Sequence, residues 1–364
     1  YSALNRTSTP MGARRLRDWL TQPLSSISKI RKRQQAVAKF INHSTILDNF
    51  FESLREVRDL ERMISRLSIG SGNARDLVQL HHALLQLPNL KRMIDEVQNI
   101  DDGIASSLND KIFKEDKLNE TPLLLNHLGS QLHELPEVTE LVSRSIVDEP
   151  PIALKEGGII REGFNSTLDE LRIGATEGKN WIAKLQKEEM EKTGITSLKV
   201  RFNSVFGYFI EITKANLDKV PEHYTRKQTL ANAERFITPE LKEMEGKILG
   251  SEERSQKLEY ELFQSVREQV LKWLPQIQEI SSALAQLDVL AGFAENARLH
   301  SHVCPDICDD GVLNIDDGRH PVLEQSMIGN PFVPNDTELE GKQQQIAVIT
   351  GPNMAGKSTY IRQV

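Results

Sequence analysis

The sequence lacks the features that mark secreted and membrane-spanning proteins. It contains only two cysteines, Cys304 and Cys308, which favours a reducing compartment over a secreted, disulfide-bonded fold. No apolar run reaches the ~18 residues that a membrane-spanning helix needs, and no signal peptide is recognisable. The first residue is Tyr1 rather than Met, so we expect the chain to be a piece of a longer protein.

The charge balance argues against a protein that coats nucleic acid with its whole surface. The 364 residues carry a net charge of -7, with 27% charged and 38% hydrophobic residues, as in globular chains with buried cores. This length predicts two or three domains. A local basic surface remains compatible with the acidic total, because residues 1–40 contain many Lys and Arg residues against Asp18 alone.

The first part of the chain has the pattern of amphipathic helices. Residues 10–145 carry apolar residues at helical spacing with charges between them. The pattern breaks at residues 68–73, and Asn73 is a suitable N-cap for the helix that follows. We therefore expect a bundle of helices over this region.

A longer helix is expected after the turn-rich residues 147–165. Thr167 and Glu170 form a T-x-x-E capping box, which predicts the start of this helix at Thr167. The pattern continues to about Thr193, and Gly194 is typical of a helix stop.

Residues 197–238 have the pattern of a small β-rich insertion, which we call the β island. Residues 197–213 are rich in β-branched and aromatic side chains and break at Asn203 and Gly207, which predicts a hairpin. Residues 223–238 are ambiguous between strand and helix, and we favour a strand because a hairpin needs a third partner to be stable. Tyr208 and Phe209 are expected in the core of the island.

A very long helical stretch follows the island. Thr238 is a suitable N-cap before a proline in the first turn, and helical character runs to about residue 302, divided by Pro275. From residue 303, short apolar runs alternate with turns, which is typical of an α/β domain.

The expected fold is therefore multidomain and mainly α. A long helical core and lever domain carries an inserted small antiparallel β clamp and is followed by the start of an α/β P-loop NTPase domain. The expected domains are a first helical part at residues 1–180, the β insertion at 181–240, the lever helices at 241–303 and a truncated nucleotide-binding part at 304–364.

A phosphate-binding motif lies near the end of the chain. Residues 351–358, GPNMAGKS, match the complete G-x-x-x-x-G-K-[ST] pattern. Glycines let backbone N–H groups turn toward phosphate oxygens, Lys357 would reach the β- and γ-phosphates, and the Ser358 hydroxyl would bind Mg²⁺. The apolar run at 344–350 predicts the strand before the loop. A glycine turn with an incidental Lys-Ser is the alternative, and the pattern alone does not separate ATPase, GTPase and kinase.

The sequence of this loop resembles the nucleotide loop of the MutS family of DNA mismatch-repair ATPases. The clamp-like sequence described below resembles the bacterial mismatch-recognition branch of that family. Ala355 departs from the Gly or Ser of many members, a change that a small side chain should tolerate. Three further stretches are similar to the family's core, clamp and first ATPase strand, in family order: LNRTSTPMGARRLRDWLTQPL (4–24), NSVFGYFIEITKANLDKVPEHYTRKQTLANAERFITPELKE (203–243) and DDGRHPVLE (316–324).

The resemblance implies two kinds of binding residue. ATP would be held by the loop with Thr359, and by Phe332 stacking on adenine; a core position in a β-rich domain is the alternative for Phe332. The loop residues are Gly351, Pro352, Asn353, Met354, Ala355, Gly356, Lys357 and Ser358. The clamp would contact phosphates of duplex DNA, although any one of its candidate contacts could simply be a solvated surface residue. The candidates are Lys199, Arg201, Asn203, Lys214, Arg226 and Lys227.

The resemblance also implies the function and its partners. These are ATP-dependent recognition of mispaired or unpaired bases in duplex DNA, with ATP and Mg²⁺ as cofactors, a homodimer, and a MutL-type matchmaker. The location would be the bacterial cytoplasm near the nucleoid, with no membrane contact. No catalytic residue is assigned, because the family's Walker B acid is expected after Val364. The fragment alone is expected to be inactive.

Three alternatives stay open on the residues alone. One is a P-loop ATPase of the chromosome-structure or transporter type, and another is a non-enzymatic DNA clamp or scaffold with a vestigial P-loop. The third concerns residues 300–308, HSHVCPDIC, which contain metal-binding side-chain types. Their spacing is not a standard zinc pattern, so we expect no metal site there.

Overall fold

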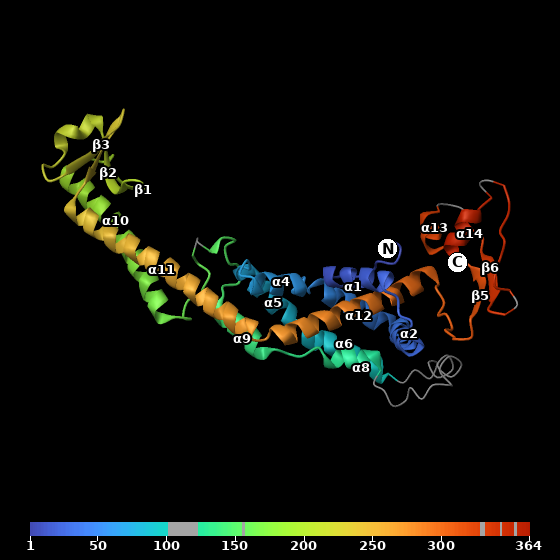
Figure 1. Cartoon of the computed structure of the whole chain (residues 1–364). Helices are drawn as coiled ribbons and strands as arrows, with labels where there is room; N and C mark the ends of the chain where they lie inside the picture. The colour runs from blue at the N-terminus through green and yellow to red at the C-terminus, as the bar shows by residue number, and fades with distance from the viewer. Residues whose placement is uncertain (101–122, 155–156, 328–331, 343, 353–354) are drawn as a thin grey trace. The chain divides into compact units, whose positions relative to one another are not determined.

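The structure is a computed structural model that describes residues 1–100, 123–154, 157–327, 332–342, 344–352 and 355–364 (Figure 1). The predicted helical region 10–145 is therefore described except for residues 101–122. The chain divides into two compact units, the first formed by residues 1–64, 82–135 and 274–364 and the second by residues 65–81 and 136–273. None of the helices in the described part combines the length and apolarity that crossing a membrane requires.

The first unit is built around one buried helix, α12 (Leu274–His300). Its neighbours are α1 (Pro10–Thr21), α2 (Ile27–Asn42), α3 (Ser44–Arg55) and α8 (Leu124–Ser130), and α6 (Leu87–Asn99) packs on α3 and α8. The side chains of α12 are buried on most sides, as expected of a helix that lies inside a bundle. The division between the units falls within α4 (Leu60–Ser68) and α5 (Ala74–Leu85), and Asn73 caps α5 as predicted, since its Oδ1 accepts from the Asp76 N–H.

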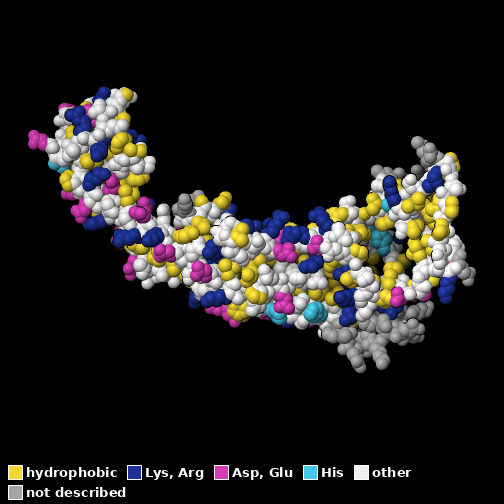
Figure 2. Space-filling model, in the orientation of Figure 1, with side chains coloured by type: hydrophobic (Ala, Val, Ile, Leu, Met, Phe, Trp, Pro, Cys, Tyr) yellow, Lys and Arg dark blue, Asp and Glu magenta, His cyan; other side chains and the backbone are white. Residues whose placement is uncertain are grey.

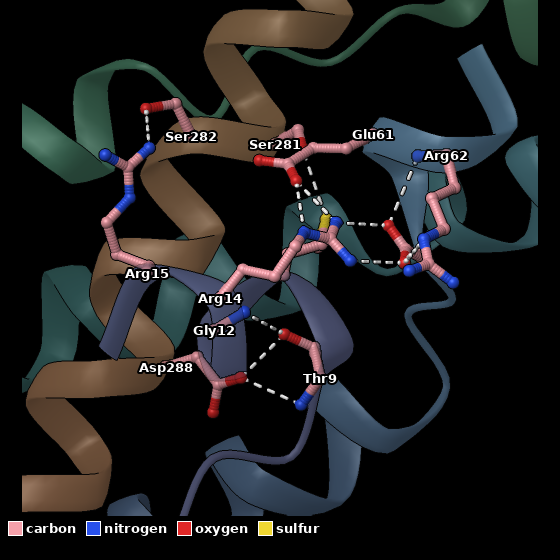
Figure 3. Close-up of polar contacts among 11 residues, drawn as sticks. Thr9, Gly12, Arg14, Arg15, Glu61, Arg62, Ser281, Ser282 and Asp288 are labelled. Carbon is pink, nitrogen blue, oxygen red and sulfur yellow. Dashed lines mark hydrogen bonds and ion pairs between the residues drawn. The ribbon is translucent and has the colours of Figure 1, made fainter. Parts of the chain in front are cut away.

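Asp288 of α12 holds the start of α1 (Figure 3). Its carboxylate accepts hydrogen bonds from the N–H groups of Ser8 and Thr9, both at 2.8 Å. The Thr9 side chain in turn accepts from the Gly12 N–H at 3.0 Å. A Cβ on Gly12 would lie 2.1 Å from Asp288 Oδ2, so the helix approaches the carboxylate as closely as glycine permits.

An ion-paired arginine lies one turn further along α1 (Figure 3). The Arg14 guanidinium donates to both Asp59 carboxylate oxygens, at 2.8 and 2.7 Å, and also to Glu61. These carboxylates raise the pKa of Arg14 further above its already high usual value, although burial acts in the opposite direction. The contacts join α1 to the segment that leads into α4.

The second unit contains a pair of long helices, α10 (Ser166–Thr193) and α11 (Pro239–Leu271), with α9 (Pro136–Ser145) packed on α11. Gly178 of α10 lies against Ile248 of α11, where a Cβ would come within 2.3 Å of Ile248 Cγ1. A glycine that weakens helix propensity therefore allows close helix packing. Figure 1 shows the two helices running side by side to the sheet.

The ends of these helices test the sequence predictions. The predicted capping box at Thr167 is wrong, because α10 starts at Ser166 and the Asn165 side chain accepts from the Leu168 N–H; asparagine in extended backbone is as good an N-cap as threonine. Gly194 ends α10 in the left-handed conformation, as predicted. Thr238 caps α11 through the Leu241 N–H, and the long helical stretch is divided near Pro275, as predicted.

The β island is a four-stranded antiparallel sheet in the order β1-β2-β4-β3. The predicted hairpin is confirmed as β1 (Lys199–Asn203) and β2 (Gly207–Thr213), followed by the 3₁₀ segment η3 (Lys214–Lys219). The favoured single strand at 223–238 is instead a second hairpin, β3 (Thr225–Thr229) and β4 (Ala233–Ile237).

One face of this sheet packs on the two long helices. Ile210, Ile212 and Phe236 form a buried cluster with Ile182 of α10 and Ile248 of α11. A second tie is polar: the Tyr224 hydroxyl donates to Glu189 of α10 at 2.6 Å. Burial and the neighbouring Glu189 raise the pKa of Tyr224 well above its usual range.

The last part of the chain contains four short elements, β5 (Val312–Gly318), α13 (Pro321–Ser326), β6 (Asn335–Glu340) and α14 (Lys357–Gln363). β5 and β6 pair antiparallel. The predicted strand at 344–350 is not formed: its described residues carry only a single bridge, Glu340↔Gln344, and Ile346 and Val348 are more than 80% exposed. A strand exists through its ladder partners, and among the described residues this run has no partner beyond that one bridge.

Candidate nucleotide and nucleic-acid sites

The phosphate loop leads directly into α14. Gly356 has φ +82° and occupies the N-cap position of that helix, a left-handed backbone that glycine adopts without steric cost. The N–H groups of Thr359 and Tyr360 both donate to the Gly356 carbonyl, at 3.0 and 2.9 Å. Asn353 and Met354, two predicted ATP contacts, lie outside the described residues.

The predicted phosphate lysine turns back into the loop. Lys357 Nζ donates to the Gly351 carbonyl and to the Pro352 carbonyl at 2.7 Å. The ammonium group is therefore held among loop backbone groups rather than extended into solvent. Ser358, on the first turn of α14, is exposed, and so is Ala355 in the loop.

Side-chain contacts fix α14 on β6. Tyr360 and Thr337 share a hydroxyl–hydroxyl hydrogen bond of 2.8 Å, and the Tyr360 hydroxyl also donates to the Asp336 carbonyl at 3.2 Å. These contacts position the helix that carries Lys357 and Ser358.

Phe332 lies beside a histidine ring. Its centroid is 6.5 Å from that of His320, and the side chain is half-buried. His320 is itself the N-cap of α13, where its Nδ1 accepts from the Leu323 N–H at 3.3 Å. A partly accessible aromatic ring is suited to stacking, and its stacking on adenine stays a prediction.

The sheet face opposite the buried cluster carries basic side chains. Lys199 and Arg201 on β1 lie opposite Glu211 and Phe209 of β2, and the Arg201 guanidinium is 3.6 Å from Glu211. Phe209 is buried, as predicted, but on this outer face rather than in the cluster against the helices, because alternate residues of a strand point to opposite faces. Lys199 is exposed.

A further arginine on this face was missed by the sequence analysis. The Arg235 guanidinium lies 4.2 Å from the centroid of the Phe209 ring, contacts Glu211 at 3.4 Å and donates to Gln228 at 2.8 Å. The available signal was alternation, since Arg235 stands between Glu234 and Phe236, both of which point to the buried face.

The other predicted DNA contacts differ in how free they are. Arg226 is paired with Glu234 at 3.3 Å, so part of its charge is neutralised within the sheet. Lys227 is exposed at the register shift between Arg226 and Gln228, and Lys214 is exposed at the start of η3. Asn203 accepts from the Val205 N–H at 2.8 Å, which is a turn-forming role.

Residues 300–308 form no metal cluster. The part of the chain that the structure describes contains no group of three or more His, Cys, Asp or Glu side chains placed to hold a metal ion. Burial, and the neighbouring His300 and Arg319, lower the pKa of His302.

Comparisons with a family model and with curated proteins agree on one family. The family model described as MutS domain III matches residues 1–294. Similar curated relatives, each named DNA mismatch repair protein MutS, come from Halothermothrix orenii (47% identical), Acetivibrio thermocellus (45%) and Salinibacter ruber (43%). The matches cover 99–100% of this chain and 38–39% of the relatives, so the chain spans about two fifths of their length.

Proposed function

Starting from the fact that this chain belongs to the MutS family, we propose that it serves the ATP-dependent recognition of mispaired or unpaired bases in duplex DNA. The relatives are named for DNA mismatch repair. In this proposal the loop at residues 351–358 binds ATP with Mg²⁺, and the four-stranded sheet contacts the duplex. The protein that carries this chain would be a DNA-dependent ATPase.

The position of the Lys357 ammonium group is the observation that best supports the proposed binding of ATP. It is already turned into the loop, where its acceptors are two neutral carbonyls. Phosphate oxygens are charged acceptors and form stronger hydrogen bonds with an ammonium group, so a bound triphosphate would take their place. The exposed Ser358 hydroxyl is suited to Mg²⁺, which would neutralise charge on the phosphates. Thr359, Phe332 and the rest of the loop complete the proposed site.

The exposed cations on and beside the sheet support the DNA half (Figure 2). Lys199, Lys214 and Lys227 are exposed, and Arg201 retains half of its side-chain surface beside Glu211. Such cations contact phosphates without reading base sequence, which suits a protein that must meet duplexes of any sequence. We keep Arg226 and Asn203 as weaker proposed contacts, because Arg226 lies closer to its carboxylate partner (3.3 Å) than Arg201 does (3.6 Å) and Asn203 already accepts from the Val205 N–H.

We also propose how the parts act together. Residues 1–180 would form the first core segment, 181–240 the clamp, 241–303 the lever helices, and 304–364 the start of the nucleotide domain. ATP and mismatched DNA would each alter binding of the other, because coupling between two sites is reciprocal. The assembly would be a homodimer that engages a MutL-type matchmaker in the bacterial cytoplasm near the nucleoid.

Paired binding measurements test this function. The protein that carries this chain should bind a duplex with one mismatch more tightly than its fully paired control, and MgATP should change that preference. Nucleotide binding without mismatch preference would favour a P-loop ATPase of the chromosome-structure or transporter type. Duplex binding that is indifferent to nucleotide would favour a DNA clamp with a vestigial loop.

A further inference from the structure

Strand β2 extends beyond its neighbour β4. The two strands pair from Ile210↔Phe236 to Thr213↔Ala233, so the first two residues of β2, Gly207 and Tyr208, lie beyond the last residue of β4, Ile237, where the chain turns into α11. A strand edge of this kind leaves backbone N–H groups in need of acceptors. Tyr208 meets this need outside the sheet, because its N–H donates to Glu245 Oε2 of α11 at 2.6 Å.

The two oxygens of the Glu245 carboxylate have different partners. Its Oε1 accepts from Lys242 Nζ of the same helix at 2.6 Å, whereas its Oε2 faces the hairpin. Gly207 has φ +77°, and a Cβ at that position would lie 2.2 Å from Glu245 Oε2. The hairpin therefore begins β2 with the residue that best allows both the backbone conformation and the approach of the carboxylate.

We propose that Glu245 is a positioning residue that takes the place of a missing strand partner and fixes the β1–β2 hairpin on α11. This inference rests on the proposed DNA-binding role of the sheet for its functional consequence. The hydrogen bond and the close approach at Gly207 carry it structurally.

The proposed phosphate contacts on β1 depend on this attachment. β1 is an edge strand whose one neighbour in the sheet is β2, so the placement of Lys199 and Arg201 follows that of β2. A second tie joins β1 to α10, since the Val200 N–H donates to Gln186 Oε1 at 2.8 Å. Glu245 supplies the tie at the turn end of the hairpin, where Val205 is 77% exposed.

Charge and position predict opposite effects for Glu245, which makes the test sharp. Glu245→Ala and Glu245→Gln each remove one negative charge from a DNA-binding unit, so electrostatics alone would tighten duplex binding in both. Gln keeps an acceptor for the Tyr208 N–H, whereas Ala keeps none. If Glu245 acts by positioning, Ala weakens binding and Gln preserves it.

The experiment compares amide hydrogen exchange at residues 205–208 with duplex affinity in the protein that carries this chain. We expect Glu245→Ala to raise exchange about tenfold and to weaken duplex binding about fivefold, whereas Glu245→Gln should stay within about threefold of the original on both. Glu243→Ala is the matched control, because Glu243 is exposed on the same helical turn and pairs with Lys247. Lys242→Met should also leave exchange unchanged within about threefold.

Each other outcome has a defined meaning. Unchanged exchange in Glu245→Ala overturns the inference, whatever the DNA result, and so does equal tightening of duplex binding by Ala and Gln. If the Glu245→Ala variant does not fold, the other two variants decide. An amide exchange rate raised about tenfold in Glu245→Gln or in Lys242→Met then overturns the inference. Absence of duplex binding by the unsubstituted protein would count against the proposed function, while the exchange measurement would still decide the attachment.

Discussion

The Thr9 hydroxyl donates a hydrogen bond to Asp288 Oδ2 at 2.6 Å, across 279 residues of sequence. The carboxylate also accepts the N–H groups of Ser8 and Thr9, and it is fully buried. Burial raises the pKa of Asp288 to about 6, although these hydrogen bonds act to lower it.

A pH-dependent contribution to stability follows from this pKa. Since the pKa of Asp288 in the folded state lies above the usual aspartate value of 3.8, the folded state binds the proton more tightly than the unfolded chain. The contribution of Asp288 to the free energy of unfolding is therefore largest below pH 3.8 and is lost as pH rises through about 6. Its full change is at most about 3 kcal/mol.

Denaturant unfolding of Asp288→Asn beside the original protein checks this expectation. The difference between their unfolding free energies should shift by about 1–3 kcal/mol between pH 4 and pH 7. Asp18→Asn, at an exposed position on α1, is the matched control for the loss of a carboxylate. A constant difference for Asp288→Asn would contradict the prediction.

Two glycines of the long helix pair should respond to alanine in opposite directions. At Gly178 an added Cβ would overlap Ile248, so Gly178→Ala should lower the free energy of unfolding by about 1–3 kcal/mol. Gly246 is exposed on α11 with no heavy atom within 4 Å of an added Cβ, so Gly246→Ala should raise it by about 0.5–1 kcal/mol. Urea titrations of both variants measure this, and equal effects would count against close packing at Gly178.

Loss of the loop ammonium group should weaken nucleotide binding without unfolding the four-stranded sheet. Lys357→Ala removes the donor to the Gly351 and Pro352 carbonyls, and we expect MgATP affinity to fall at least about tenfold. Lys342→Ala is a matched control, because Lys342 is an exposed lysine outside the loop. Fluorescent-nucleotide titration measures both, and unchanged affinity in Lys357→Ala would remove the loop from the proposed site.

The two neighbouring cations of β3 should contribute unequally to DNA binding. Lys227 is exposed, whereas Arg226 is paired with the buried carboxylate of Glu234. Lys227→Gln should therefore reduce the slope of log affinity against log salt by about 0.9, with weaker binding across all duplex sequences. Arg226→Gln should change the slope less but lower stability, because it leaves Glu234 without its partner. Salt titrations with one duplex distinguish the two, and equal slopes would show that the sheet pairing does not matter.

Local patterns predicted the helices and the first hairpin well. The cap at Thr238, the stop at Gly194 and the division near Pro275 follow from backbone chemistry that acts within a few residues, and each is confirmed. The match of MutS domain III to residues 1–294 confirms the family resemblance.

The features that failed or were missed depend on contacts distant in sequence. The apolar run at 344–350 has strand character but needs neighbouring strands. The cap of α10 is a local exception, because Asn165 and Thr167 are both suitable N-cap residues and the structure uses Asn165. The partnership of Asp288 with Thr9 and that of Glu245 with Tyr208 involve side chains on separate elements. No periodicity within one segment reports such pairs. The predicted binding residues at the loop and sheet stay predictions.

The two carboxylate attachments of the sheet come from different helices. Glu189 of α10 receives the Tyr224 hydroxyl, and Glu245 of α11 receives the Tyr208 N–H. The sheet is therefore attached to both long helices. If α10 moves along its axis relative to α11, the two attachment points move by different amounts and the sheet tilts. A small axial displacement then becomes a rotation of the surface that carries Lys199 and Arg201.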